Sequence, residues 1–416
     1  MMTKLQYILK LAACLELTLL TVLAGPFSTS LENETEGAID AGIAGFTGPD
    51  GEGNVKMITI YDEDTLEPIY MNPNNYVNPI FRGWATGYTN YKPTPGVATV
   101  APAEGSSHGE GYSEWGNPTK SLGPVTGNNF DIVTLGDLYS TSQAPPRGSY
   151  PPYMDPTDLN YKPYLGNPQD PDDGFGFIGI DNPGEITLTF DIPIANGPGA
   201  DFVVFENAFI SGGGAGVAGQ TFAELAYVEV STDGVHFARF PSIFLGKDEL
   251  VGGYGTVDPT EIYNLAGKHC NAYGASWGTP FDLDSLVDYA NLVAALLEAG
   301  ITLDEAQLAR LQAAIDANRA LVDAELLDLN EINFVKIVDI PGNGFFKDSI
   351  GNSIYDAWVT VGSGGFDLEA VGVINDIYSI AIPELASSWL IFGICALGAV
   401  SVRLRFGRQQ RNYTSR

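Results

Sequence analysis

Residues 184–190 read Gly-Glu-Ile-Thr-Leu-Thr-Phe, and residues 226–232 read Ala-Tyr-Val-Glu-Val-Ser-Thr. Polar and apolar side chains alternate in both stretches, which is the period of a half-buried β-strand. The pattern returns at 334–339 and 357–361, while residues 201–206 (Asp-Phe-Val-Val-Phe-Glu) form the mostly apolar run of a buried strand. Because the strands are short and helices do not alternate with them, we expect an all-β fold, an antiparallel jelly-roll β-sandwich.

One segment interrupts the strands with a helical pattern. Leucines, Tyr289 and Val293 recur at helix spacing within 284–299, and Gly300 follows as a C-terminal cap. Residues 302–305 (Thr-Leu-Asp-Glu) match a capping box at the start of a second helix. We therefore predict a helical hairpin over 284–328, which is either a lid packed on the sandwich or a surface for a partner or a second copy.

The remaining chain divides by composition. Residues 1–24 carry two lysines and then an apolar run that ends in small residues, which is the layout of a secretory signal peptide. A lipoprotein box at Leu11–Cys14 and a retained anchor are the alternatives. Residues 25–56 are polar and predict a flexible acidic leader. Residues 57–175, rich in Tyr, Pro, Asn and Gly, predict a loop-rich first part of a single β-sandwich domain over 57–381.

The C-terminal segment 382–416 has three parts. Pro383 and Glu384 precede an almost uncharged stretch over 386–402, and Arg403 and Arg405 begin a basic tail. The stretch is barely long enough for one transmembrane helix, and the arginines would hold its far end in the cytoplasm. The bulk of the chain would then face outward.

The acidic charge of the chain excludes one class of partner. The formal net charge is −31, and 13 basic against 49 acidic residues leave the segment 25–381 near −36. Binding to nucleic acid requires a basic surface, so we exclude it. Cys270 is the single cysteine of this segment, which leaves no internal disulfide to stabilise an exported domain.

An acidic exported protein with oxygen ligands favours calcium as a structural cofactor. No stretch matches an EF-hand loop, so the site would be irregular. Carboxylates that bound the predicted strand 201–206 and one that follows a Gly-Gly pair are the candidate ligands: Asp201, Glu206, Asn207 and Asp367. The alternative is that these side chains cap turns and accept backbone hydrogen bonds.

Aromatic residues in glycine-rich loops are candidates for stacking on sugar rings. They are Trp84, Trp115, Tyr254, Tyr273 and Trp277. Packing in the core is the alternative for each of them.

Catalytic motifs are weak. Residues 274–278 (Gly-Ala-Ser-Trp-Gly) match a nucleophile elbow, but no histidine follows and Pro280 comes too soon for a helix. The adjacent His269 and Cys270 do not form a dyad by sequence alone. A glycosidase needs two facing carboxylates, and the many acids give no means of choosing a pair. We predict no enzymatic activity.

Two resemblances extend this interpretation. The C-terminal segment resembles the PEP-CTERM sorting signal of Gram-negative bacteria, although Leu385 replaces the second proline of the motif. Stretches such as 81–87, 115–123, 197–207 and 364–375 resemble a group of secreted bacterial cell-surface proteins with such signals, over about residues 80–375 apart from the hairpin. Their body is similar to the discoidin or galactose-binding-like jelly roll, to which 229–234 is most similar.

The resemblances imply a location and partners. An exosortase-type enzyme would process the C-terminal segment, and the protein would be anchored in the inner membrane until then and afterwards lie at the cell surface or outside the cell. An ordinary single-pass C-terminal anchor that is permanently retained is the alternative. Polysaccharide or envelope components would be its partners. We therefore expect a non-catalytic binding or structural protein, with calcium-stabilised carbohydrate binding. A secreted carbohydrate-active enzyme and a purely architectural envelope protein remain the alternatives.

Overall fold

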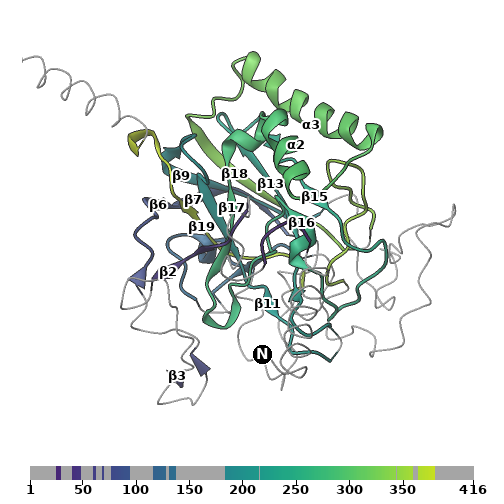
Figure 1. Cartoon of the computed structure of the whole chain (residues 1–416). Helices are drawn as coiled ribbons and strands as arrows, with labels where there is room; N and C mark the ends of the chain where they lie inside the picture. Colours follow the sequence, from purple (N-terminus) through teal and green to yellow (C-terminus); the bar gives the residue numbers. More distant parts are fainter. Residues whose placement is uncertain are drawn as a thin grey trace, which may run out of the picture.

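The computed structural model describes part of the chain (Figure 1). The described residues are 25–29, 40–47, 76–93, 116–127, 131–136 and 183–379 without 215, 343 and 359–363, together with the backbone of two short strands, β3 (Ile60–Tyr61) and β4 (Pro68–Ile69). The predicted signal peptide 1–24 and the sorting segment 382–416, with Pro383, Glu384, Arg403 and Arg405, lie outside the described residues, as does most of 57–175. In the described ranges, no helix is long and apolar enough to cross a membrane.

Antiparallel strands build the body and curl into a half-barrel (Figure 1). The first large sheet has the order β1 (Ile43–Ala44), β17 (Trp277–Phe281), β10 (Phe202–Glu206), β19 (Asp367–Val373) and β6 (Gly83–Trp84), and β8 (Val133–Thr134) also pairs with β19. The second has the order β14 (Ala238–Arg239), β13 (Ala226–Ser231), β18 (Ile332–Asp339), β9 (Glu185–Ile194) and β7 (Gly87–Lys92). Four further pairs of short strands are β11 (Phe209–Ile210) with β12 (Thr221–Phe222), β15 (Ile243–Phe244) with β16 (Ile262–Tyr263), β2 (Phe46–Thr47) with β5 (Tyr76–Val77), and β3 with β4.

The expected antiparallel β class is confirmed. The alternating stretches at 184–190, 226–232 and 334–339 lie in β9, β13 and β18, and the apolar run 201–206 contains β10, which is buried along its whole length. The expected strand at 357–361 is not found in its described part, where Ala357 and Trp358 lie outside any strand.

The main core lies where the two large sheets meet. Ile186 and Leu188 of β9 pack in the same cluster as Phe202 and Val204 of β10. The ring of Phe202 stacks on Phe281 of β17 with centroids 5.4 Å apart. Burying an aromatic side chain of this size contributes about 1.5–3 kcal/mol. Successive side chains of a strand point to opposite faces, so the apolar residues of the alternating β9 pattern are those on the face toward this cluster.

The two helices α2 (Tyr289–Glu298) and α3 (Glu305–Asp323) pack on the body as a lid. Their buried leucines and isoleucine join a core cluster with Phe27, Ile243, Tyr263 and Ile350. The predicted capping box at 302–305 is two residues out of place. Asp304 is the N-cap, and its carboxylate and the side chain of Gln307 form the reciprocal bonds of the box. Asp and Gln serve this motif as well as Thr and Glu do, which explains the shift.

Residues 25–29 and 40–47 of the predicted leader pack against the body. Phe27 and Ser28 are buried, and β1 adds to the edge of a large sheet by pairing with β17. Asp40 forms a buried ion pair with Lys268, with 2.5 Å between carboxylate and ammonium. We expected a polar leader because its few apolar residues give no period, but Phe27 fills a place in the core beneath the helices.

Candidate functional site

Four aromatic rings contact one another in a continuous row, two from the β11–β12 hairpin and two from other loops. Phe209 and Phe222 stand opposite each other in the hairpin, and their rings stack with centroids 4.8 Å apart. Tyr273 meets the outer side of Phe209 edge-on at 5.6 Å, and Tyr254 lies 6.3 Å from Phe222. Tyr254 is 50% exposed and Tyr273 is 41% exposed. We call these four residues the aromatic row.

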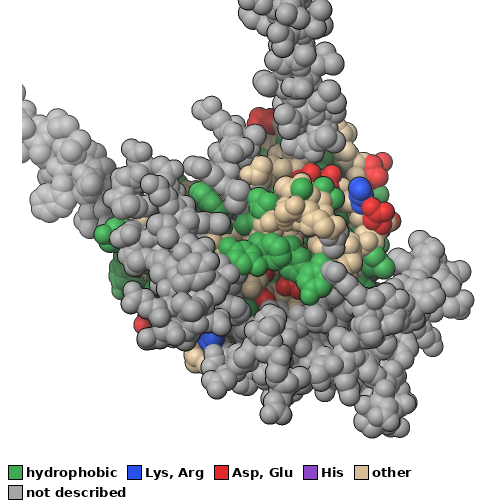
Figure 2. Space-filling view, turned by 90° about the horizontal axis from the view of Figure 1, so that it is seen from below, with side chains coloured by type: hydrophobic (Ala, Val, Ile, Leu, Met, Phe, Trp, Pro, Cys, Tyr) green, Lys and Arg blue, Asp and Glu red, His purple; other side chains and the backbone are tan. Residues whose placement is uncertain are grey.

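The row lies on the lower side of the body. Figure 1 places β11 in the lower part of the body, and Figure 2, seen from below, shows hydrophobic side chains gathered at the centre of this face with acidic side chains beside them. The two exposed tyrosine rings are surfaces against which apolar faces of a ligand can pack, and the stacked phenylalanines join them. Tyr254 and Tyr273 were both predicted as stacking residues, and the structure brings them into one row through two phenylalanines.

Tyr273 is held in a strained conformation. Its φ is +56°, in the left-handed region that bulky residues rarely adopt. Neighbouring backbone bonds fix the turn: Ala272 N–H donates to the carbonyl of Ala208, and Ser276 N–H donates to that of Asn271. Strain of this kind costs about 1 kcal/mol or more, and it is found where a side chain is presented for a function.

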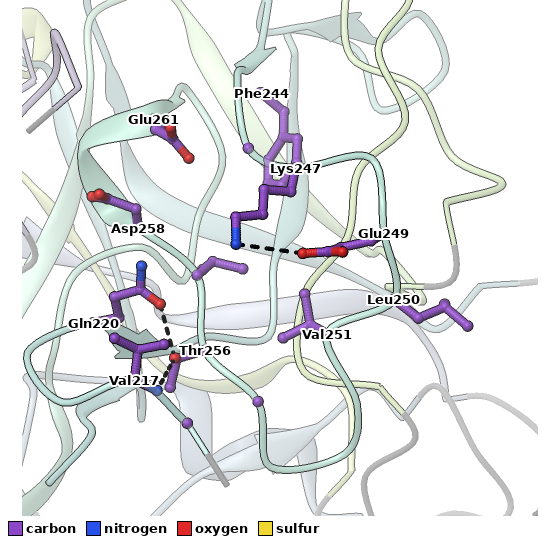
Figure 3. Close-up of a pocket in the computed structure, with 14 residues that line it drawn as sticks. Val217, Gln220, Phe244, Lys247, Glu249, Leu250, Val251, Thr256, Asp258 and Glu261 are labelled. Atoms are coloured by element: carbon purple, nitrogen blue, oxygen red, sulfur yellow. Dashed lines mark hydrogen bonds and ion pairs between the residues drawn. The ribbon is translucent and has the colours of Figure 1, made fainter. Parts of the chain in front are cut away.

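A pocket of about 210 Å³ adjoins the row (Figure 3). The two share one loop, since Tyr254 belongs to the row and the next residues, Gly255 to Val257, line the pocket. The hydroxyl of Thr256 accepts from Val217 N–H at 2.8 Å and donates to the side-chain oxygen of Gln220 at 3.0 Å. These bonds tie the loop to the hairpin that carries the row.

The walls of the pocket are acidic. Figure 3 shows Asp258 and Glu261 on one side, and Lys247 reaching toward Glu249 on the other. The Lys247–Glu249 pair spans 3.4 Å and is largely exposed. Burial and, second, the charge of Asp258 raise the pKa of Glu261. Carboxylates beside aromatic rings suit a ligand rich in hydroxyl groups, because the carboxylates accept hydrogen bonds at fixed points.

Three of the four predicted calcium ligands lie together. The side-chain nitrogen of Asn207 donates to Oδ2 of Asp367 at 3.3 Å, and the charge of Asp367 acts on Glu206. Oε2 of Glu206 accepts from Ala208 N–H at 2.8 Å, whereas Oε1 is buried without a hydrogen-bond partner among the described residues. Burial, and next the charge of Asp367, raise the pKa of Glu206 well above its ordinary value.

Asp201 is not part of this group. It stands at the opposite end of β10, roughly 16 Å away along the strand. Its Oδ1 accepts from Gly197 N–H at 2.7 Å and from the Asn375 amide at 2.9 Å, and its Oδ2 accepts from Leu283 N–H at 2.8 Å. Asp201 therefore fastens three loops, as the turn-capping alternative predicted.

The carboxylates near Glu206 are too few to bind calcium without additional oxygen ligands. Within the described ranges, no group of three or more His, Cys, Asp or Glu side chains is arranged to hold a metal ion. Glu206 and Asp367 supply two carboxylates, and a hard cation would need the Asn207 amide oxygen and backbone carbonyls as well. The orphaned Oε1 of Glu206 is the atom that a cation would satisfy.

The tryptophans do not join the row. Trp84 packs at 4.7 Å from Phe81 and 6.0 Å from Phe205, in a separate core cluster. Trp277 is half-buried in β17, opposite Ala44. Trp115 lies outside the described residues.

Sequence reasoning missed Phe209 and Phe222 as members of the row, and Asp258 and Glu261 as walls of the pocket. A signal for the phenylalanines exists, because they flank a glycine-rich stretch of hairpin length. No signal separates the two acids from the others in the chain.

Comparison with known proteins gives no relative from which a function could be inferred, so the proposal for a function rests on the geometry described above and on the sequence. No family model matches the chain, and no curated protein matches it.

Proposed function

We propose that the protein is an exported cell-surface or extracellular-matrix component that binds carbohydrate without acting on it. The aromatic row carries this proposal. Its two tyrosines are exposed, its phenylalanines make it rigid, and its neighbouring pocket offers carboxylates for sugar hydroxyls. The chemistry of both parts fits a polysaccharide with alternating apolar faces and hydroxyl edges.

We infer further that the fold is a jelly roll. Successive long strands alternate between the two large sheets, with β9, β13 and β18 in one and β10, β17 and β19 in the other. Such alternation is typical of two-sheet jelly rolls, which are common in lectin-like domains. Fold alone does not set function, so this point adds to the row but does not replace it.

Export, sorting and calcium belong to the same proposal. The sequence features of 1–24 and 382–416 support export, processing by an exosortase-type enzyme and a place at the surface of a Gram-negative cell. Calcium at Glu206, Asn207 and Asp367 would join the end of β10 to the start of β19. Because β11 follows directly after β10, this would also support the aromatic row.

The tyrosines provide the direct test. We expect Tyr254→Ala and Tyr273→Ala each to weaken polysaccharide binding by about 1.5–3 kcal/mol, roughly 10- to 150-fold, because each removes an aromatic ring that the ligand would bury. Binding of the exported protein to a panel of insoluble polysaccharides would be measured by pull-down. Tyr378→Ala is the matched control, since Tyr378 is 61% exposed and has no place in the row.

Two further variants distinguish carbohydrate binding at the aromatic row from hydrolysis of the carbohydrate. Tyr273→Asn tests the ring without disturbing the turn, because asparagine tolerates the left-handed conformation. Equal binding by all variants would remove the row as the site. The raised pKa of Glu261 is the one observation that favours a glycosidase, in which a protonated carboxyl acts as the acid. Release of reducing ends that is lost in Glu261→Gln would replace the binding function with hydrolysis.

A further inference from the structure

The backbone nitrogen of Gly25 begins a short hydrogen-bond relay. It donates to Oγ1 of Thr260 at 2.5 Å, and the same hydroxyl donates to Oδ1 of Asp258 at 2.6 Å. Asp258 also accepts from Thr260 N–H at 3.0 Å and caps the turn Pro259–Glu261. The relay therefore connects the nitrogen of Gly25 to a carboxylate that is fixed in place.

The fit around Gly25 is close. A Cβ atom at this position would lie 2.2 Å from the carbonyl oxygen of Thr260, so only glycine can lie against this peptide. The next residues hold the segment in register. Phe27 N–H donates to the Thr260 carbonyl at 3.0 Å, and the Phe27 ring stacks on Tyr263 at 5.3 Å. Ser28 N–H donates to the Asp40 carboxylate at 2.9 Å.

The lysines nearest the relay are already paired with other carboxylates. Asp258 and Glu261 belong to the same turn, and burial and, second, the charge of Asp258 raise the pKa of Glu261. Of the nearby cations, Lys268 is paired with Asp40 and Lys247 is paired with Glu249 at the exposed rim. A further positive group beside Thr260 would offset the two carboxylates.

We propose that cleavage of the peptide bond between Ala24 and Gly25 supplies this group, and that Thr260 and Asp258 form a receptor for the new N-terminal amine. Water is added across the bond, so the carboxylate leaves with the signal peptide and Gly25 keeps an ammonium group. Before cleavage the same nitrogen is a neutral amide with a single N–H. Processing thereby adds a charge to the relay and locks the first residues of the mature chain onto the core beneath α2 and α3.

This inference depends on the export signal within the proposed function, and it does not depend on carbohydrate binding. Gly25, the residue after the predicted cleavage point, would have a role of its own, because its amine would be bound by the body. The amine is captured by a hydroxyl and a carboxylate, as amines are in other recognition sites.

The test uses the full chain, exported from a Gram-negative host with its own leader. Mass spectrometry identifies the new N-terminus, and the rate of acylation of its α-amine is then measured near neutral pH. An ammonium that donates to the Thr260 hydroxyl, with the Asp258 carboxylate one hydrogen bond beyond, is expected to have a raised pKa. Each unit of increase lowers the reactive fraction about tenfold. We expect acylation of the wild-type amine to be about tenfold slower than that of Asp258→Asn.

The variants are chosen to keep the fold. Asparagine caps a helical turn as well as aspartate does, so Asp258→Asn removes the charge and preserves the turn. Glu249→Gln is the matched control, because Glu249 lines the same pocket but pairs only with exposed Lys247; its amine should react at the wild-type rate. Thr260→Val should accelerate acylation as Asp258→Asn does.

The outcomes distinguish the two levels of the proposal. An N-terminus other than Gly25 would overturn both the amine receptor and the predicted cleavage point. Cleavage before Gly25 with equal acylation rates in wild type, Asp258→Asn and Glu249→Gln would overturn the receptor alone and leave export intact.

Discussion

Without calcium, the free energy of unfolding is expected to fall by about 4 kcal/mol or more as the pH rises from about 4 to about 8. Burial raises the pKa of Asp201 from 3.8 to about 7 and that of Asp339 to about 7, and it raises that of Glu206 well above its ordinary value. Such a group binds its proton more tightly in the folded state. Its stabilising contribution is complete below the ordinary pKa and is lost as the pH rises through the folded value.

Asp201 alone sets the scale. A shift of about three units corresponds to about 4 kcal/mol at 1.4 kcal/mol per unit, and Asp201 is fully buried. The net charge of −31 acts in the same direction, because the chain repels itself more strongly as its acids ionise. Urea unfolding across this pH range measures the effect. A free energy that rises toward pH 8 would contradict it.

Calcium is expected to reverse part of this loss. At about 100 times its dissociation constant, calcium that binds only the folded state adds about 2.7 kcal/mol. Glu206→Gln should raise the stability of the calcium-free protein at pH 8, since it removes a buried charge, and it should abolish the response to calcium. Glu249→Gln is the control, because this exposed carboxylate should affect neither property. A calcium response that survives in Glu206→Gln would exclude the site.

Lys268→Ala is expected to cost about 3–5 kcal/mol of stability. Lys268 is fully buried, and its ammonium donates to Oδ2 of Asp40 at 2.5 Å and to the carbonyl of Ile262 at 2.8 Å. The substitution leaves the Asp40 carboxylate buried without its cation. Because Asp40 also accepts from Ser28 N–H, the first described segment should detach before the body unfolds.

Denaturant unfolding and limited proteolysis near residues 25–47 measure these two effects. Lys247→Ala is the matched control, since its pair with Glu249 is exposed and should contribute less than about 1 kcal/mol. A Lys268→Ala protein within 1 kcal/mol of wild type would show that the buried pair is not a fastening point.

The antiparallel β class of this protein can be predicted from short stretches of its sequence. The alternation in 184–190, 226–232 and 334–339 has period two, and a strand needs nothing more to turn one face to a core. The helical hairpin is equally local, because its period and caps lie within 45 residues. In the expected strand 357–361 the two described residues, Ala357 and Trp358, lie outside any strand although the stretch alternates in the same way, so alternation alone does not place these two residues in a sheet.

The aromatic row and the acidic group at the end of β10, unlike the strands and helices, could not be predicted from local sequence. Tyr254 and Tyr273 are identifiable in the sequence as aromatic residues of glycine-rich loops, but their exposure is seen only in the structure. Their alignment requires Phe209 and Phe222, which come from the two strands of a separate hairpin. Asp201 and Glu206 bound one strand and look equivalent in sequence. Their roles differ because three loops meet at one end of β10 and an acidic group gathers at the other.

The sequence by itself determined the class of secondary structure, the acidic character and the features that predict export, since each depends on composition or on neighbours along the chain. Tertiary structure alone decided which aromatic rings meet, which acids are buried and that Gly25 and Phe27 belong to the body. These properties depend on contacts such as the one between Gly25 and Thr260, which are 235 positions apart. Local periodicity carries no information about pairings at that separation, because they are selected by the packing of the whole core.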